Sequence, residues 1–295
     1  MKRVGEKELY VFTENGFKRG SNDFARKDAG YYVSNYGELV SNISEIQYSN
    51  RDYVFLFRGQ NGDYADERGL TTIKPSMYRN YSPSKGLVFD RDKIIQNSKH
   101  LEMCEAKLIE KFSDVYGSRN EFLHDLKRNE ILRWSILQHY EICKTPLLDV
   151  TSSLSVACSF ASISINKNKS ESESDFAHIM VLAVPALTGG ASVFADEGFQ
   201  VLRLSNFCPP SAARPHWQEG YLIGPYPTFR PTRRAELNRG DDVECAVRLV
   251  AKFNFNVDSF WKKSRTHRKL PKSALFPNRS DPLFRPMSDL RRECQ

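Results

Sequence analysis

A run of five apolar residues, 53–57, constrains the fold of this chain more than any other feature of its sequence. The run is aromatic and β-branched, follows charged residues and is closed by Arg58 and Gly59. It therefore predicts a buried strand that carries an arginine at its end. Further apolar segments of the same kind, separated by Pro-containing turns, predict strands at 145–150, 176–184, 200–204, 221–223 and 244–255.

Helical periodicity fills the intervals between these strands. Apolar residues recur at spacings of three and four in 35–46, and helices are also predicted at 92–116 and 120–140. Another helix follows the strand at 145–150, with Thr151 or Ser152 as its cap. The chain of 295 residues is therefore expected to form an α+β fold, in which helices flank a mixed β-sheet core.

The start of the chain differs in character from the rest. Residues 1–32 are polar, contain an Asn-Gly pair that favours a hairpin turn, and are interpreted as an N-terminal extension. Residues 33–288 are expected to form one domain. The polar segment 166–175 is typical of a solvated loop inside a domain rather than of a linker between two domains.

The sequence indicates a cytoplasmic protein without a membrane anchor. Its charged first residues are not followed by the apolar run of a secretory signal, and the apolar segments 179–187 and 243–255 are too short to cross a membrane. Six cysteines are scattered without a Cys-x-x-Cys pair or a Cys/His spacing suited to zinc. We therefore expect reduced thiols and no metal site.

The net charge of +7 leaves two interpretations open. Lysines and arginines concentrate at 230–239, at 262–272 and in the last ten residues, a pattern that suits a polyanion such as RNA. A solvated basic surface without a specific partner explains a charge of this size equally well.

Five separated sequence blocks carry a resemblance to a known family. They are Phe-Arg-Gly-Gln at 57–60, Lys-Pro-Ser-Met-Tyr-Arg at 74–79, Gln-His-Tyr at 138–140 with Leu-Leu-Asp-Val-Thr-Ser at 147–152, Arg214 with Gln218, Gly220 and Tyr221, and Ser-Ala-Leu-Phe-Pro at 273–277. In this order they resemble the FRG domain, which is named after its Phe-Arg-Gly motif. Two departures from the family pattern are Val150, where an aromatic residue is common, and Asn278, where Asp is common.

A second resemblance suggests a chemistry. The order of three features is similar to the Arg-Ser-Glu pattern of NAD-dependent ADP-ribosyltransferases. These features are an arginine at a strand end, then a strand end rich in hydroxyls, and then a glutamate. The matching positions here are Arg58, the run 151–153 and Glu219. This resemblance implies an ADP-ribosyltransferase-like fold, NAD as the cofactor, and a toxin or anti-phage effector that modifies an intracellular macromolecule such as RNA. A toxin would bring an antitoxin protein as a partner.

The resemblance also assigns roles to residues. Glu219 would stabilise the positive charge that develops on the ribose, with Gln218 beside it and Arg58 as the third catalytic candidate. One departure is that Gln218 and Glu219 are adjacent, whereas in those enzymes the second residue of such a pair follows two positions later, where Gly220 stands here.

The remaining candidates are expected to bind the cofactor. Arg58 would hold the pyrophosphate, and Gly59 would let the backbone approach the ligand. The hydroxyls of Thr151, Ser152 and Ser153 would hold the nicotinamide ribose. Gln60, His139 and Tyr140 complete this set, with Tyr140 or Trp217 as the ring that stacks on nicotinamide.

Each of these assignments has a structural alternative. Arg58 can form an ion pair with Asp149, Thr151 and Ser152 can cap a helix, and Glu219 can be a solvent-exposed loop acid. Two further functions therefore stay open. One is a non-catalytic FRG module that binds nucleic acid or a protein, and the other is a metal-independent hydrolase or nuclease built on His139 and Asp149.

Overall fold

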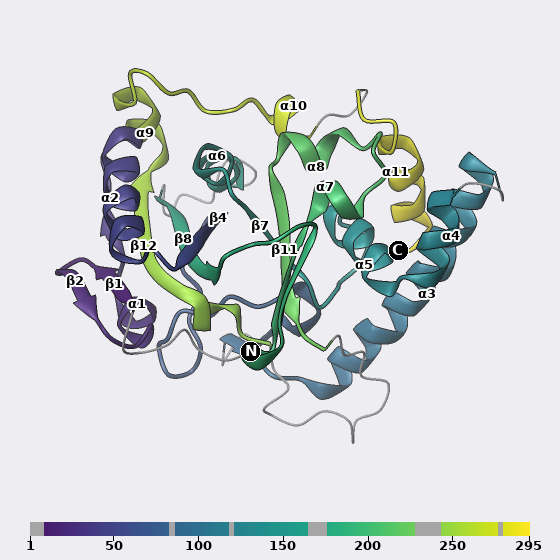
Figure 1. Ribbon diagram of the computed structural model, residues 1–295, viewed down its shortest axis with the longest axis horizontal. Helices are drawn as coiled ribbons and strands as arrows, with labels where there is room; N and C mark the ends of the chain where they lie inside the picture. The colour runs from purple at the N-terminus through teal and green to yellow at the C-terminus, as the bar shows by residue number, and fades with distance from the viewer. Residues whose placement is uncertain (1–8, 83–85, 118–120, 165–175, 228–242, 277–279) are drawn as a thin grey trace.

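The computed structural model describes residues 9–82, 86–117, 121–164, 176–227, 243–276 and 280–295, which form a mixed sheet with helices around it (Figure 1). The strands are β1 (Tyr10–Thr13), β2 (Gly16–Arg19), β3 (Tyr31–Tyr32), β4 (Tyr53–Gln60), β5 (Asn80–Ser82), β6 (Gly86–Val88), β7 (Leu148–Thr151), β8 (Phe176–Pro185), β9 (Ala191–Phe194), β10 (Phe199–Arg203), β11 (Gly220–Pro225) and β12 (Leu249–Asn256). The α-helices are α1 (Asp23–Lys27), α2 (Tyr36–Ser49), α3 (Arg91–Tyr116), α4 (Glu121–Arg128), α5 (Glu130–His139), α6 (Leu154–Ser164), α7 (Leu204–Phe207), α8 (Ala213–Trp217), α9 (Val257–Lys263), α10 (Lys272–Leu275) and α11 (Phe284–Glu293).

One eight-stranded sheet organises the described chain, in the order β3-β12-β8-β4-β7-β11-β10-β9. Its neighbours pair antiparallel, except that β3 runs parallel to β12. The ten-residue strand β8 is apolar and buried over most of its length, because it lies between β4 and β12. The predicted mixed sheet flanked by helices is therefore confirmed.

Helices cover the sheet in separate groups (Figure 1). Helix α6 packs across β4, β7 and β8, whereas α2 and α9 pack together beside β12. Helices α3, α4, α5 and α11 gather at the other end of the molecule. Strands β4, β7 and β11 thus lie in the middle of the sheet. The pair α2 and α9 lies toward one end of it, and the group of α3, α4, α5 and α11 toward the other.

Local capping explains where several helices begin. Asn35 accepts a hydrogen bond from the Glu38 backbone N–H at the start of α2, where the periodicity predicted a helix. The helix predicted over 120–140 is two helices, because Asn129 accepts from the backbone N–H groups of Ile131 and Leu132 and starts α5. The strand predicted over 244–255 begins only at Leu249, because a 3₁₀ turn precedes it.

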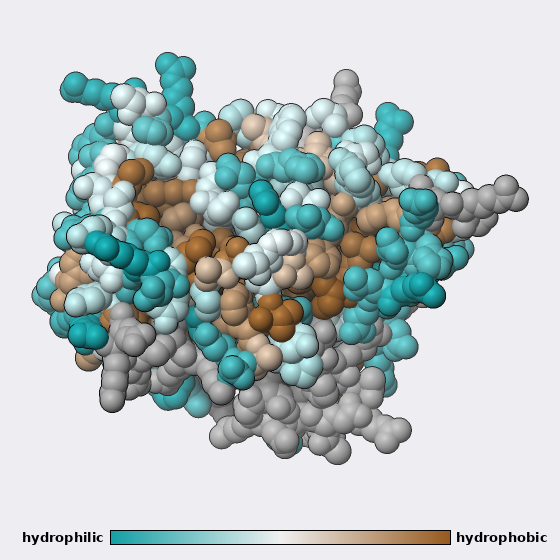
Figure 2. All heavy atoms as spheres, viewed as in Figure 1, coloured by the Kyte–Doolittle hydropathy of each residue, from teal (hydrophilic) through white to brown (hydrophobic). Residues whose placement is uncertain are grey.

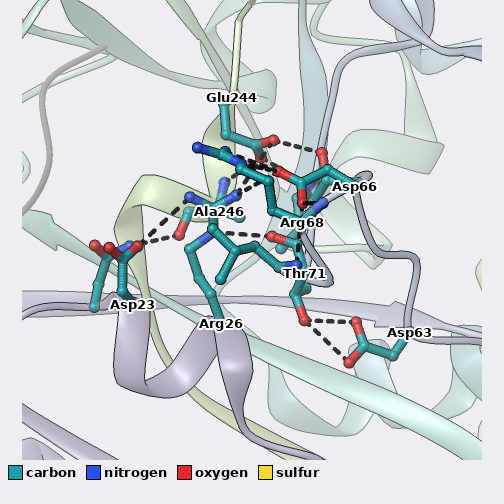
Figure 3. Close-up of polar contacts among 12 residues, drawn as sticks. Asp23, Arg26, Asp63, Asp66, Arg68, Thr71, Glu244 and Ala246 are labelled. Carbon is teal, nitrogen blue, oxygen red and sulfur yellow. Dashed lines mark hydrogen bonds and ion pairs between the residues drawn. The ribbon is translucent and has the colours of Figure 1, made fainter. Parts of the chain in front are cut away.

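The N-terminal segment is packed onto the domain. The predicted Asn-Gly hairpin is formed by β1 and β2, and β3 joins the main sheet at β12. Figure 3 shows how α1 is held: Arg26, which is 2% exposed, lies 3.8 to 4.0 Å from carboxylates of Asp23, Asp66 and Glu244. Its Nε also donates to the Thr71 carbonyl at 2.9 Å. Residues 9–32 are therefore an integrated part of the fold.

Candidate functional site

A pocket of about 200 Å³ opens where strands β4, β7 and β11 lie side by side. Its polar lining consists of Arg58, His139, Glu141, Asp149, Thr151, Arg214 and Gln218. Apolar atoms of Phe57, Val150, Ala157, Phe160 and Leu204 complete the wall. The pocket therefore combines apolar walls with a few converging polar groups, which is the usual composition of a ligand site.

The pairing of the three strands brings these residues together. Thr151 of β7 pairs with Phe57 of β4 on one side and with Gly220 of β11 on the other. Arg58 follows Phe57 directly, and Gln218 lies just before β11. Three sequence blocks that are far apart in the chain thus meet because their strands are neighbours.

Gly59 lines the pocket but has a different reason to be glycine than the one predicted. A Cβ at this position would lie 1.9 Å from the Ala157 carbonyl oxygen and 3.0 Å from the Ala161 nitrogen, both in the backbone of α6. No side chain fits there. The missing side chain allows β4 to cross α6 at close range, which is a requirement for glycine beside the predicted approach to a ligand.

Arg58 is held by the neighbouring strand. Its Nη1 donates to the backbone carbonyl of Asp149 at 2.6 Å, so the contact expected between these two residues is made by the main chain. Burial lowers the pKa of the Arg58 guanidinium to about 10, with a contribution from the charge of Arg79, while the Asp149 carboxylate acts in the opposite direction. The group stays cationic at neutral pH and lines the pocket.

His139 and Asp149 form a pair at the base of the pocket. The His139 Nδ1 lies 3.6 Å from an Asp149 carboxylate oxygen, and the histidine is 2% exposed. Burial lowers the pKa of His139, although Asp149 opposes the shift. Burial alone would raise the pKa of Asp149, but hydrogen bonds from His139 and Gln138 and the charge of Arg58 bring it below its usual value. A neutral imidazole beside a charged carboxylate is the result.

Thr151 and Gln218 line the pocket and also brace it. The Thr151 hydroxyl donates to the Gln218 carbonyl at 2.8 Å and accepts from the Ser153 backbone N–H at 3.0 Å. It therefore ties β7 to the turn before β11 and to Ser153. The Ser153 carbonyl accepts the first hydrogen bond of α6, from the Ala157 N–H, so Ser153 stands at the cap position that was expected for Thr151 or Ser152. The Gln218 Nε2 donates to the Leu275 carbonyl at 2.7 Å and fixes α10 beside the pocket.

The other predicted site residues lie outside the pocket lining. The Gln60 amide donates to the Gly62 carbonyl, and the Tyr140 hydroxyl donates to Asp281. Ser152 is exposed and Ser153 half-buried at the start of α6.

Glu219 is the carboxylate that the sequence predicts to be catalytic. It is exposed, has a φ of 44° in the turn before β11, and is not part of the pocket wall. Trp217, one of the two rings expected to stack on nicotinamide, is 49% exposed. The carboxylates that do line the pocket are Asp149 and Glu141.

Arg214 and Glu141 also line the pocket, although the sequence alone assigned neither of them a role. The two side chains approach to 3.4 Å, and the Arg214 guanidinium lies 4.8 Å from the Phe276 ring centroid. Both also line an adjoining hollow of about 130 Å³ that includes Tyr140 and Met287. Arg214 therefore stands between two adjacent cavities. The block that Arg214 forms with Gln218, Gly220 and Tyr221 was the only signal in the sequence, because the contact with Glu141 spans distant parts of the chain.

The described residues also bear on the basic clusters, on membrane-spanning helices and on metal ligands. Lysines and arginines of 262–272 are exposed except for the half-buried Lys269, whereas the basic cluster at 230–239 and the loop at 166–175 fall outside the described residues. No described helix is long and apolar enough to span a membrane. Within the described ranges, no three His, Cys, Asp or Glu side chains are placed to hold a metal ion.

The fold and the pocket together define an α+β protein with a mixed sheet and an arginine-lined polar site. Residues 54–170 match the family model of the FRG domain, so this part of the chain is an FRG domain and the family resemblance is confirmed. The matched segment includes Arg58, His139, Asp149 and Thr151, while Arg214 lies beyond it. No curated protein and no solved structure matches the chain.

Proposed function

We propose that this pocket binds NAD and that the protein splits the bond between nicotinamide and ribose, transferring ADP-ribose to an intracellular acceptor. The observation that carries the proposal is the meeting of Arg58, Thr151 and Gln218 on or beside the adjacent strands β4, β7 and β11. These are the segments whose chain order resembles the Arg-Ser-Glu pattern. Their convergence on one cavity is what a shared ligand would require.

Two guanidinium groups would hold the pyrophosphate of NAD. Arg58 and Arg214 both line the pocket, and planar guanidinium groups bind phosphate oxygens in pairs of hydrogen bonds. The Nε of Arg214 is buried without a hydrogen-bond partner among the described residues, so one donor is available. The nicotinamide riboside end would occupy the pocket, and the adenosine end would extend past Arg214 into the adjoining hollow.

A carboxylate would stabilise the transition state. Breaking the nicotinamide bond builds positive charge on the ribose, and a fixed negative group beside it lowers the barrier. Asp149 lines the pocket and keeps a lowered pKa, so it is ionised at neutral pH. We assign this role to Asp149, because the exposed Glu219 is not part of the wall.

RNA is the acceptor that the surface favours. The stretch 262–272 carries six lysines and arginines and no acidic residue, and it leads directly into α10 and to Leu275, whose carbonyl is bonded to Gln218. Figure 1 traces this connection from α9 to α10, and Figure 2 shows hydrophilic side chains projecting where α9 lies. Such a stretch would guide a phosphate backbone to the pocket. A toxin, with an antitoxin as its partner, or an anti-phage effector would be the corresponding biological role.

Calorimetry with NAD and a nicotinamide-release assay test the proposal. The wild-type protein should bind NAD and release nicotinamide. Arg58→Ala should weaken NAD binding by about 10- to 100-fold, the usual effect of losing hydrogen bonds to a charged group. Arg51→Ala is the matched control, because this exposed arginine stacks on Tyr48 and neither residue is part of the pocket lining. If the wild-type protein does not bind NAD, the proposal is wrong.

A second candidate function uses the same pocket. The His139–Asp149 pair and its supporting hydrogen bonds favour a metal-independent hydrolase or nuclease. Cleavage of an RNA oligonucleotide in the presence of a chelator, without nicotinamide release, would favour this function. RNA binding that falls with salt, with neither cleavage nor nicotinamide release, would instead indicate a non-catalytic binding module.

A further inference from the structure

The two ring nitrogens of His139 have different surroundings. Nδ1 faces the Asp149 carboxylate at 3.6 Å, whereas Nε2 is buried without a hydrogen-bond partner in the part of the chain that the structure describes. A buried polar atom without a partner is costly, so such atoms are few in folded proteins and each calls for an explanation. His139 lines the pocket, where a bound molecule would supply the missing partner.

A chain of hydrogen bonds holds the carboxylate in place. The Thr145 hydroxyl donates to the side-chain oxygen Oε1 of Gln138 at 2.5 Å, and the Nε2 of the same side chain donates to an Asp149 carboxylate oxygen at 2.5 Å. The second carboxylate oxygen faces His139. A carboxylate at Nδ1 favours the tautomer with its proton on Nδ1, which leaves a lone pair on Nε2. Because burial lowers the pKa of His139, the ring is neutral and able to accept a proton at neutral pH.

We infer that His139 is the general base that takes a proton from a hydroxyl acceptor, with Asp149 as its positioning residue. This inference rests on the proposed cleavage of NAD and adds the chemical class of the acceptor. A carboxylate acceptor needs no base. A guanidinium or ammonium acceptor would meet the charges of Arg58 and Arg214. A hydroxyl, whether of water or of RNA ribose, is neutral and nucleophilic only as its proton leaves.

The proposed step forms one bond to the ribose and breaks one. The acceptor O–H gives its proton to His139 Nε2 while its oxygen forms a bond to the anomeric carbon of the ribose. The bond from that carbon to the pyridinium nitrogen breaks, and its electron pair stays with nicotinamide, which leaves as a neutral molecule. The imidazolium then returns its proton to solvent. No oxidant, reductant or metal ion takes part.

Azide provides the decisive probe, because this anionic nucleophile has no proton to lose. With water as the acceptor, His139→Ala should release nicotinamide on the order of 10²- to 10⁴-fold more slowly than wild type. Added azide should restore most of that loss in His139→Ala and yield the azido adduct of ADP-ribose. His216→Ala is the matched control, because this exposed histidine lies on α8 outside the pocket lining, and it should behave like wild type with both nucleophiles.

Three outcomes overturn the inference. His139→Ala can retain wild-type turnover with water, or it can lose turnover to the same extent with water and with azide, as a merely structural role would predict. The third outcome is that wild type binds no NAD, so that the proposed function fails as well. Calorimetry with NAD on the same samples distinguishes this outcome from the first two. If His139→Ala unfolds, His139→Asn serves instead, since it also removes the imidazole but leaves the Asp149 carboxylate in place, and it should also respond to azide.

Discussion

Gly59→Ala is expected to destabilise the protein strongly. The added Cβ would lie 1.9 Å from the Ala157 carbonyl oxygen, whereas carbon–oxygen contacts in proteins rarely fall below about 3.3 Å. Strand β4 and helix α6 would have to separate by about 1.4 Å on that comparison. The Ala157 carbonyl oxygen and the nearby Ala161 nitrogen are both backbone atoms, which cannot move away by a side-chain rotation. We therefore expect a loss of about 3 kcal/mol or more, at the upper end of the cost of overpacking.

Urea unfolding followed by circular dichroism measures this loss. The midpoint should move to lower urea while the slope stays unchanged. Gly62→Ala is the matched control, because its new Cβ would meet only Tyr64 ring atoms at 3.7 Å or more, and its stability should stay within about 1 kcal/mol of wild type. A Gly59→Ala protein as stable as the control would refute the close crossing of β4 and α6. The position of Arg58, which precedes this glycine, would then be in question too.

Three further predictions concern charge. Asp149→Asn should lower the rate of nicotinamide release on the order of 10²-fold or more, whereas Glu219→Gln should leave that rate unchanged. The reverse result would assign the catalytic carboxylate to Glu219. Replacing the lysines and arginines of 262–272 by glutamine should weaken RNA binding and lower its salt dependence, which fluorescence anisotropy at several salt concentrations measures. NAD binding should not change. Unchanged anisotropy would remove the case for RNA docking. Burial lowers the pKa of His139 and of His178 below 6.5, so the unfolded chain takes up protons first and the free energy of unfolding should fall as pH drops below 6.5. Replacing both histidines by asparagine should flatten that decline in urea titrations, and a slope that does not change would contradict it.

The sequence predicted those features that depend on neighbouring residues. The periodicity of α2, the apolar run of β4 and the Asn-Gly turn between β1 and β2 are local patterns, and all three are confirmed. The break between α4 and α5 was readable in principle, since Asn129 stands immediately before the first residues of α5. Local patterns also located the blocks that line the pocket.

Contacts between distant segments could not be predicted in this way. At Gly59 the sequence predicted only a close approach to a ligand, whereas the close crossing of α6, which also requires glycine there, depends on the tertiary fold. Glu219 matched a pattern in the chain, yet the turn at this residue, with its positive φ, leaves it exposed while Gln218 is buried in the pocket wall. The pairing of Arg214 with Glu141 likewise depends on the tertiary fold.

The position of Thr151 between β4 and β11 also has a consequence for how the protein matures. The pocket is complete only when all three strands have paired, because β4 and β11 are distant in the sequence and become neighbours through β7, which pairs with both. Pairings of this kind close long loops and form late and slowly. A growing chain on the ribosome would therefore carry no working site until β11 has emerged and paired. If the protein attacks RNA in the cell that makes it, this order of assembly would keep the growing chain inactive until these strands have paired.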